Sequence, residues 1–68
     1  MTRLHINGEE AELEAANVAE LLAARGIDPQ ARFLAVAVNG AVVRRVDWPT
    51  RPLSSGDRIE IVRPLQGG

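Results

Sequence analysis

The sequence predicts an α+β fold in which one main helix packs on a mixed sheet of four to five strands. Three features lead to this prediction: two Asn-Gly dipeptides between short apolar or alternating segments, one capped helical segment between these dipeptides, and a final alternating segment. Asn-Gly is a strong hairpin signal, because both central residues of a type I′ turn need positive φ. The order is therefore strand, strand, helix, strand, strand, strand, for which one helix over one sheet is the compact solution.

The first hairpin is expected at the start of the chain. Arg3–Ile6 alternates polar and apolar residues with period two, as a half-buried strand does, and Asn7-Gly8 supplies the turn. Glu10–Leu13 alternates again and is expected to be the returning strand. The residues that would share the inner face of this hairpin are Leu4, Ile6, Ala11 and Leu13.

The helix is expected over residues 17–26. Asn17 is a favourable N-cap, and Glu20 three residues later completes a capping-box-like pair. Gly26 is placed where a left-handed residue would end the helix, and Pro29 prevents its continuation. The apolar stripe that such a short helix needs to pack on a sheet consists of Val18, Leu21 and Leu22.

A second hairpin and an irregular connection are expected after the helix. Leu34–Val38 is predicted to be a strand, Asn39-Gly40 the turn and Ala41–Arg45 the returning strand. The segment that follows contains a tryptophan and two prolines, which indicates a connection without regular structure. Within this connection, Leu53 is expected to reach the core.

The final strand is predicted to be Arg58–Arg63, after a turn at Ser55–Asp57. Its inward residues would be Ile59 and Ile61. Pro64 cannot donate a hydrogen bond to a sheet, so strand pairing should end near it. These elements together predict a β-grasp, or ubiquitin-like, domain over residues 1–64 and a C-terminal tail over residues 65–68.

The composition is that of one small globular domain. The 68 residues are 46% hydrophobic and 25% charged, with a net charge of −1 and no basic surplus for nucleic acid. Cysteine is absent and His5 is the one histidine, so we expect no disulfide and no bound metal. No apolar run approaches the roughly 20 residues that span a bilayer, and the first residues lack the apolar stretch of a signal peptide. We therefore expect a cytoplasmic protein without a membrane partner.

The C-terminal Gly67-Gly68 pair is the candidate functional group. Two residues without Cβ can pass through a narrow slot at no steric cost. A tail that begins at Leu65 can extend about 13 Å, at about 3.3 Å per residue, and so place one carboxylate inside a partner's active site. A carboxylate must first be activated, for instance as a mixed anhydride with AMP, before a sulfur donor can convert it to a thiocarboxylate. If the cargo is sulfur, a chain without cysteine has no other group to hold it.

The chain resembles the ThiS family, the sulfur carriers of thiamine thiazole biosynthesis. The resemblance spans nearly the whole sequence and is most specific in the arginine-tryptophan segment, the Gly-Asp before the last strand and the terminal Gly-Gly. The residues that carry it are Val18–Leu22, Val36–Gly40, Val42–Arg45, Trp48, Leu53, Gly56–Val62 and Gln66–Gly68.

The resemblance implies a protein co-substrate rather than an enzyme. It implies that an E1-like adenylating enzyme of the ThiF or MoeB kind consumes ATP to adenylate Gly68, and that a sulfur donor system then forms the thiocarboxylate. A thiazole synthase of the ThiG kind would receive the sulfur. Leu65, Gln66 and Gly67 would bind inside the partners, and the carrier itself would be a free monomer without a bound cofactor.

The outer face of the sheet is a candidate partner surface. Small alanines on this face would let another protein approach closely, so we expect the adenylating enzyme and the synthase to dock here. The residues of this surface are Arg3, His5, Ala35, Ala37, Glu60 and Val62. The roles of two further groups remain open. Arg44 and Arg45 are either a solvated strand end or a docking pair, and Trp48 is either a lid on the core or a partner contact.

Four other functions can be compared with the sequence. A hydrolytic set of His5 with Ser54 or Ser55 has no sequence context that would activate a nucleophile. A small subunit of molybdopterin synthase would use the same fold and tail. A ubiquitin-like modifier would be joined to target lysines, although this chain, which has no lysine, could not form side-chain-linked chains of itself. A plain interaction module would function without its last two residues.

Overall fold

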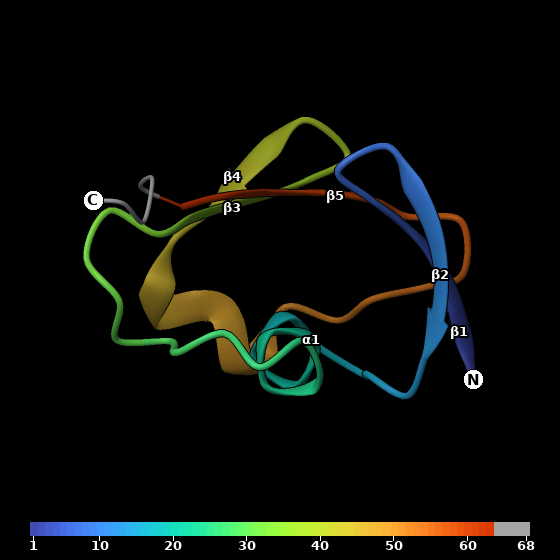
Figure 1. The fold of residues 1–68 in the computed structure, drawn as a ribbon, viewed down its shortest axis with the longest axis horizontal. Coiled ribbons are helices and arrows are strands. Elements are labelled where there is room, and N and C mark those ends of the chain that lie inside the picture. Colours follow the sequence, from blue (N-terminus) through green and yellow to red (C-terminus); the bar gives the residue numbers. More distant parts are fainter. Residues whose placement is uncertain (64–68) are drawn as a thin grey trace.

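The computed structural model describes residues 1–63, in which five strands form one sheet around a single α-helix (Figure 1). The predicted tail, with Leu65, Gln66, Gly67 and Gly68, and its boundary at residue 64 lie outside the described residues. The elements are β1 (Thr2–Ile6), β2 (Glu9–Leu13), α1 (Val18–Ala24), β3 (Ala35–Val38), β4 (Ala41–Val43), the 3₁₀-helix η1 (Arg45–Thr50) and β5 (Arg58–Val62).

The sheet is mixed, with the last strand of the chain at its centre. The strand order is β2-β1-β5-β3-β4; β5 runs parallel to β1 and antiparallel to β3. Figure 1 shows the sheet curving over α1 and η1, which lie together on its concave side. The predicted α+β class, one helix on a mixed sheet, is confirmed, and the number of strands in residues 1–63 is five.

Both Asn-Gly turns have the predicted geometry. The φ angles are 51° and 86° at Asn7 and Gly8, and 52° and 85° at Asn39 and Gly40. Such positive angles are available to glycine at no steric cost and are tolerated by asparagine. The predicted inner face of the first hairpin is also confirmed. Leu4 and Ile6 are buried, and Ala11 and Leu13 are partly buried and pack against the core.

The helix begins as predicted and ends slightly earlier. The Asn17 Oδ1 accepts a hydrogen bond from the Glu20 N–H at 2.9 Å. The Glu20 carboxylate accepts from the Ala16 N–H at 2.8 Å, one residue before the N-cap. Gly26, with φ 72°, lies two residues beyond the last helical residue. A helix this short depends on packing, and its predicted apolar residues Val18, Leu21 and Leu22 are all buried.

The segment after β4 differs from the prediction. The strand ends at Val43 rather than Arg45, and η1 replaces the expected irregular connection. The reason is Trp48, which is 2% exposed and donates its indole N–H to the Val43 carbonyl at 2.9 Å. A buried indole needs such a partner, and reaching it turns the chain beneath the sheet. Trp48 is therefore part of the core.

The two arginines that follow β4 are both exposed, and each has an intramolecular partner. Arg44 forms an ion pair with Asp47 at 3.3 Å. The Arg45 guanidinium lies 4.9 Å from the centre of the Trp48 ring and donates to the carbonyls of Pro29 and Ala31, in the latter case at 2.9 Å. Arg45 thus connects the core to the loop between α1 and β3.

Candidate functional site

The outer face of the sheet carries the predicted surface residues. Val36, Val38, Ile59 and Ile61 are buried beneath the sheet, so the residues that alternate with them point outward. All six predicted positions lie on the three adjacent central strands β1, β5 and β3, and Arg3 is the partner of Glu12 on the neighbouring edge strand β2. Two of the six side chains, His5 and Ala37, are half-buried. The other four are exposed: Arg3, Ala35, Glu60 and Val62.

One half of this face is apolar. Ala37 on β3 has Glu60 of β5 as its partner on one side and Val42 of β4 on the other. Ala35 is paired with Val62, two residues further along both strands. Val62 is 61% exposed and Val42 is 76% exposed, although both are apolar. We call Ala35, Ala37, Val42 and Val62 the apolar half; its alanines leave its centre open to close approach.

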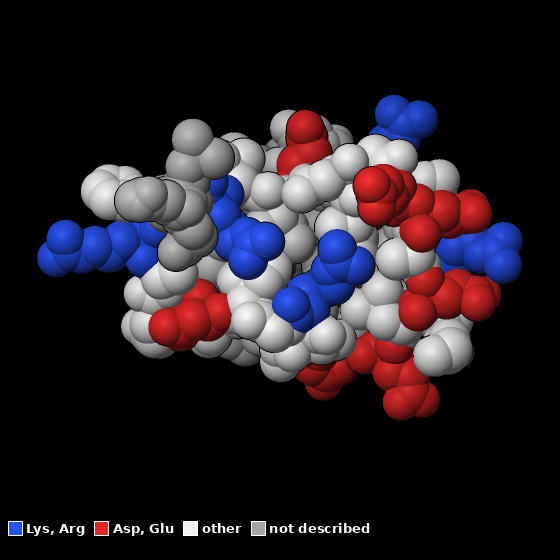
Figure 2. All heavy atoms as spheres, viewed as in Figure 1, with Lys and Arg blue, Asp and Glu red and all other residues white. Residues whose placement is uncertain are grey.

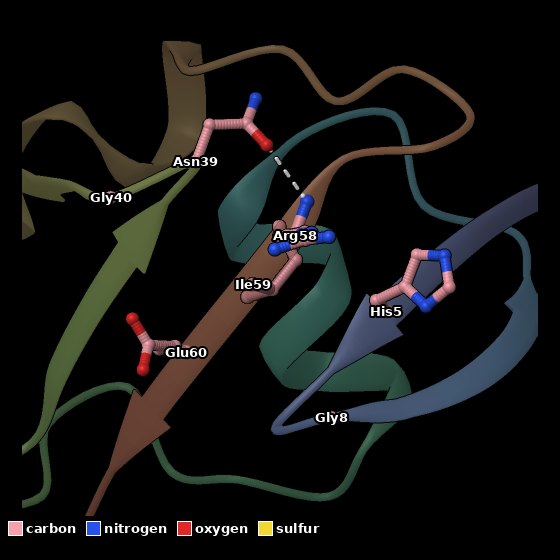
Figure 3. Close-up of a pocket in the computed structure, with 7 residues that line it drawn as sticks. All are labelled: His5, Gly8, Asn39, Gly40, Arg58, Ile59 and Glu60. Carbon is pink, nitrogen blue, oxygen red and sulfur yellow. Dashed lines mark hydrogen bonds between the residues drawn. The ribbon is translucent and has the colours of Figure 1, made fainter.

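The other half is charged and slightly hollow. Figure 3 shows the hollow between the two hairpin turns, with the Arg58 and His5 side chains coming from adjacent strands and Glu60 on the opposite side. His5 and Arg58 are partners in the parallel β1–β5 register. Glycines at the turns, Gly8 and Gly40, line the hollow without side chains. A mixture of charges in an open depression suits polar contacts with another protein.

Two site types can be checked in residues 1–63, a metal site and the hydrolytic set. No group of three or more histidine, cysteine, aspartate or glutamate side chains in this range could hold a metal ion. The Ser55 hydroxyl accepts a hydrogen bond from the Arg3 N–H at 3.4 Å. Neither Ser54 nor Ser55 is hydrogen-bonded to His5 in this part of the chain, so the hydrolytic hypothesis has no geometric support.

The acidic side chains are concentrated at one end of the molecule. β2 carries three exposed glutamates, and Figure 2 shows acidic side chains gathered at the β1–β2 end. One of these glutamates, Glu12, pairs with Arg3 across the hairpin at 3.2 Å. Arg3 therefore has an intramolecular partner, and the charged hollow is built mainly from His5, Arg58 and Glu60.

Sequence reasoning missed two side chains that hold β5, the strand that leads to the tail. The Asn7 amide accepts from the Ile61 N–H at 2.8 Å and donates to the Ile61 carbonyl at 3.2 Å. It thereby extends the β1–β5 ladder beyond the end of β1. The Asn39 amide accepts from the Arg58 N–H at 2.9 Å and donates to Asp57 at 3.0 Å. The turn signal explains these asparagines by their φ angles alone and does not indicate this second role.

Arg58 and Val42 were also missed as surface residues, although the sequence held the signal. The alternation that places Ile59 and Ile61 inward also places Arg58 outward. The second hairpin, folded at its Asn-Gly turn, brings Val42 opposite Ala37.

The predicted site residues Leu65, Gln66, Gly67 and Gly68 lie outside the described residues. In residues 1–63, no helix is long and apolar enough to cross a membrane.

A mixed sheet that curves over one helix, with its parallel first and last strands side by side, defines a ubiquitin-like β-grasp protein. The model of the ThiS family matches residues 4–68, nearly the whole chain, and the chain therefore belongs to this family.

Individual relatives agree with this assignment. The chain is 35% identical to the sulfur carrier protein ThiS of Thermus thermophilus, over 93% of this chain and 95% of the relative. The crystal structure of the thiamine biosynthesis protein ThiS from Geobacter metallireducens is 31% identical and superimposes with a TM-score of 0.78, over 98% of this chain and all of that one. Its solution structure gives the same TM-score over 88% of that chain.

Proposed function

We propose that this chain is a sulfur carrier of thiamine biosynthesis and that it carries the sulfur as a thiocarboxylate on Gly68. The observation that supports this most is the family match, which extends to residue 68 and so includes Gly67-Gly68. The curated relative is named a sulfur carrier, and it aligns over nearly its full length. The match also favours the thiamine pathway over the molybdopterin pathway that the sequence left open.

The chemistry needs no side chain of the carrier. An oxygen of the Gly68 carboxylate attacks the α-phosphate of ATP on the adenylating partner, which forms an acyl-adenylate and releases pyrophosphate. A sulfur nucleophile from the donor system then attacks the acyl carbon, and AMP leaves. If the donor is a persulfide, this attack gives an acyl disulfide; a second thiol then attacks the donor's own sulfur, a disulfide forms between the two thiols, and Gly68 leaves as the thiocarboxylate. The thiazole synthase takes up this sulfur, and an E1-like enzyme is the partner that the ATP step requires.

The tail is proposed to act from a fixed base. β5 lies between two neighbouring strands, and the Asn7 amide bonds to Ile61, one residue before the strand ends at Val62. A short tail delivers its carboxylate accurately only if the residue from which it starts is well held, because a mobile base would spread its end over a larger volume. Leu65, Gln66 and Gly67 are the proposed contacts inside the partner's slot.

The outer face is the proposed docking surface for both the adenylating enzyme and the synthase. Its apolar half has exposed valines around small alanines, which suits contact with another protein surface. If both partners use it, they must bind in turn and compete. An Ala37→Arg variant should therefore lose affinity for both, while Glu14→Arg, an exposed position between β2 and α1 and outside the sheet, should bind both normally. Normal adenylation of Ala37→Arg would contradict this role.

Intact-protein mass spectrometry tests the carrier function. After incubation with the adenylating enzyme, ATP and a sulfur source, the wild-type chain should show a sulfur-for-oxygen mass increase that maps to Gly68. A variant that lacks Gly68, and one extended by a single alanine, should show none, because each misplaces the carboxylate. A variant with an alanine added before Met1 is the matched control and should react like the wild type. Sulfur transfer by the extended form without trimming would refute the proposal.

Three further observations separate the remaining alternatives. A ubiquitin-like modifier would give covalent adducts of higher mass that survive denaturation and reductant. A plain interaction module would keep its binding partners after removal of Gly67 and Gly68. A molybdopterin synthase subunit would purify with the large subunit of that enzyme rather than with a thiazole synthase.

A further inference from the structure

Phe33, in the loop before β3, combines two unfavourable features. Its side chain is 78% exposed, so a large apolar ring lies in water. Its φ angle is 62°, in the left-handed region. The other non-glycine residues with positive φ in residues 1–63 are asparagines, which tolerate this geometry, whereas a bulky side chain is an outlier there. Neither feature of Phe33 is offset by burial within the domain.

The corner that contains Phe33 is held from both sides. Before it, the Ala31 carbonyl accepts a hydrogen bond from the Arg45 guanidinium at 2.9 Å, and Arg45 lies against the buried Trp48 ring. After it, Leu34 is 7% exposed, and β3 begins at Ala35. A left-handed backbone at a non-glycine residue persists where its surroundings determine it, and such residues are concentrated at functional sites.

Phe33 also lies at the end of the sheet where β5 finishes. Ala35, two residues later, is the antiparallel partner of Val62, the last residue of β5. Figure 1 shows the loop before β3 and the end of β5 at the same end of the molecule. Phe33 is therefore an exposed aromatic residue two positions before Ala35 of the apolar half, near the point where β5 ends. Two exposed arginines lie near it in the chain or at the same end of the sheet: Arg32 directly precedes Phe33, and Arg63 follows the last residue of β5.

We propose that Phe33 is an anchor residue that inserts into an apolar pocket of the adenylating enzyme, beside the opening that admits the C-terminal tail. The two arginines indicate that acidic side chains border this pocket. This inference rests on the proposed function, since it assumes that the partner takes up the tail. An aromatic residue whose backbone is held before binding loses less conformational freedom when its ring enters a pocket, which favours its use as an anchor.

The test compares two substitutions of Phe33 with one control. Phe33→Asn removes the ring, while asparagine tolerates the positive φ of this position. Because the ring is lost, affinity for the adenylating enzyme should fall about 10- to 30-fold. The KM for the carrier should rise while kcat is retained, because the tail is unchanged. Phe33→Tyr keeps an aromatic ring and should remain within about threefold of the wild type. Val46→Asn alters another exposed apolar residue, which is 72% exposed and lies on η1 beside α1, and should bind normally.

Thermal unfolding of the same variants gives a readout that needs no partner. If the ring serves only binding, Phe33→Asn should unfold at the same temperature as the wild type or a few degrees higher, because backbone strain is relieved. A clear decrease would mean that the ring stabilises the domain, and would overturn the proposal. Unchanged affinity of Phe33→Asn for the enzyme would overturn it as well.

Failure of this inference is distinguishable from failure of the proposed function. If Phe33→Asn is adenylated with an unchanged KM, the carrier function stands and the anchor does not. If the wild type binds the enzyme through Phe33 but is never adenylated, the anchor stands and the carrier function does not. Sedimentation of the free chain tests a third case, in which a second copy of this chain contacts Phe33. If the free chain is a dimer and Phe33→Asn dissociates it, the second copy is the partner of Phe33, and the proposal is overturned.

Discussion

The two Asn-Gly turns have the same backbone and different tertiary roles. Their φ angles agree within a degree, yet Asn7 holds the end of β5 and Asn39 holds its start. The Asn7 amide pairs with both main-chain groups of Ile61 in a partly buried setting. The Asn39 amide is exposed and divides its bonds between the Arg58 N–H and the Asp57 carboxylate. One dipeptide signal therefore predicts a local shape, while the surroundings decide how much each asparagine contributes to stability.

The largest difference between the turns is expected when each asparagine is replaced by glycine, which keeps the positive φ. Asn7→Gly leaves a partly buried N–H and carbonyl of Ile61 without these partners and should lower the free energy of unfolding by about 2 kcal/mol. Asn39→Gly should cost only about 0.5–1 kcal/mol, because water can replace exposed hydrogen bonds. Urea denaturation measures both values.

Hydrogen exchange locates the effect of these two variants. The Ile61 amide should exchange faster in Asn7→Gly than in Asn39→Gly, since only the former removes its acceptor. Equal losses of stability in the two variants would mean that burial does not distinguish the turns.

A smaller effect is expected from a charge placed in the exposed turn. Asn39→Asp keeps an acceptor for the Arg58 N–H but replaces the donor to Asp57 with a second carboxylate. At neutral pH the repulsion should cost about 1 kcal/mol and should weaken as salt is added, because exposed charges are screened. Stability curves at low and high salt check this, with Asn39→Gly as the uncharged control. A loss that does not depend on salt would rule out the charge explanation.

The smallest difference is expected at the glycines of the two turns. A Cβ at Gly8 or Gly40 would meet no atom within 4 Å, so only the left-handed backbone, at φ 86° and 85°, opposes a side chain. Gly8→Ala and Gly40→Ala should therefore destabilise the domain equally, by about 1 kcal/mol each. Thermal unfolding of the pair is the measurement. Clearly unequal costs would show that one turn is strained by its surroundings.

Sequence reasoning was sufficient where structure follows from local rules. The alternation of residues, the Asn-Gly dipeptides and the Asn17 cap predicted the order of elements and the inner face of the sheet. The same alternation predicted that Ala35 and Ala37 lie outward with Glu60 and Val62. The part of the candidate site that is built from strands could thus be read from the sequence.

The features that were missed depend on side-chain contacts that no repeating sequence pattern encodes. The 3₁₀-helix η1 forms because Trp48 bonds to Val43, and Arg45 is fixed by carbonyls of a loop more than ten residues earlier in the chain. No short period encodes either contact. Phe33 adopts a left-handed backbone without the glycine or asparagine that would signal it. The role of the terminal glycines stays a prediction, since they lie outside the described residues.

The central position of β5 has a mechanical consequence. The strand is bonded to a parallel neighbour on one side and to an antiparallel neighbour on the other. A pull applied from its C-terminal end would load both rows of bonds at the same time, in shear, instead of opening one row bond by bond from an edge. A partner enzyme could therefore draw on the end of this chain with considerable force before the domain came apart.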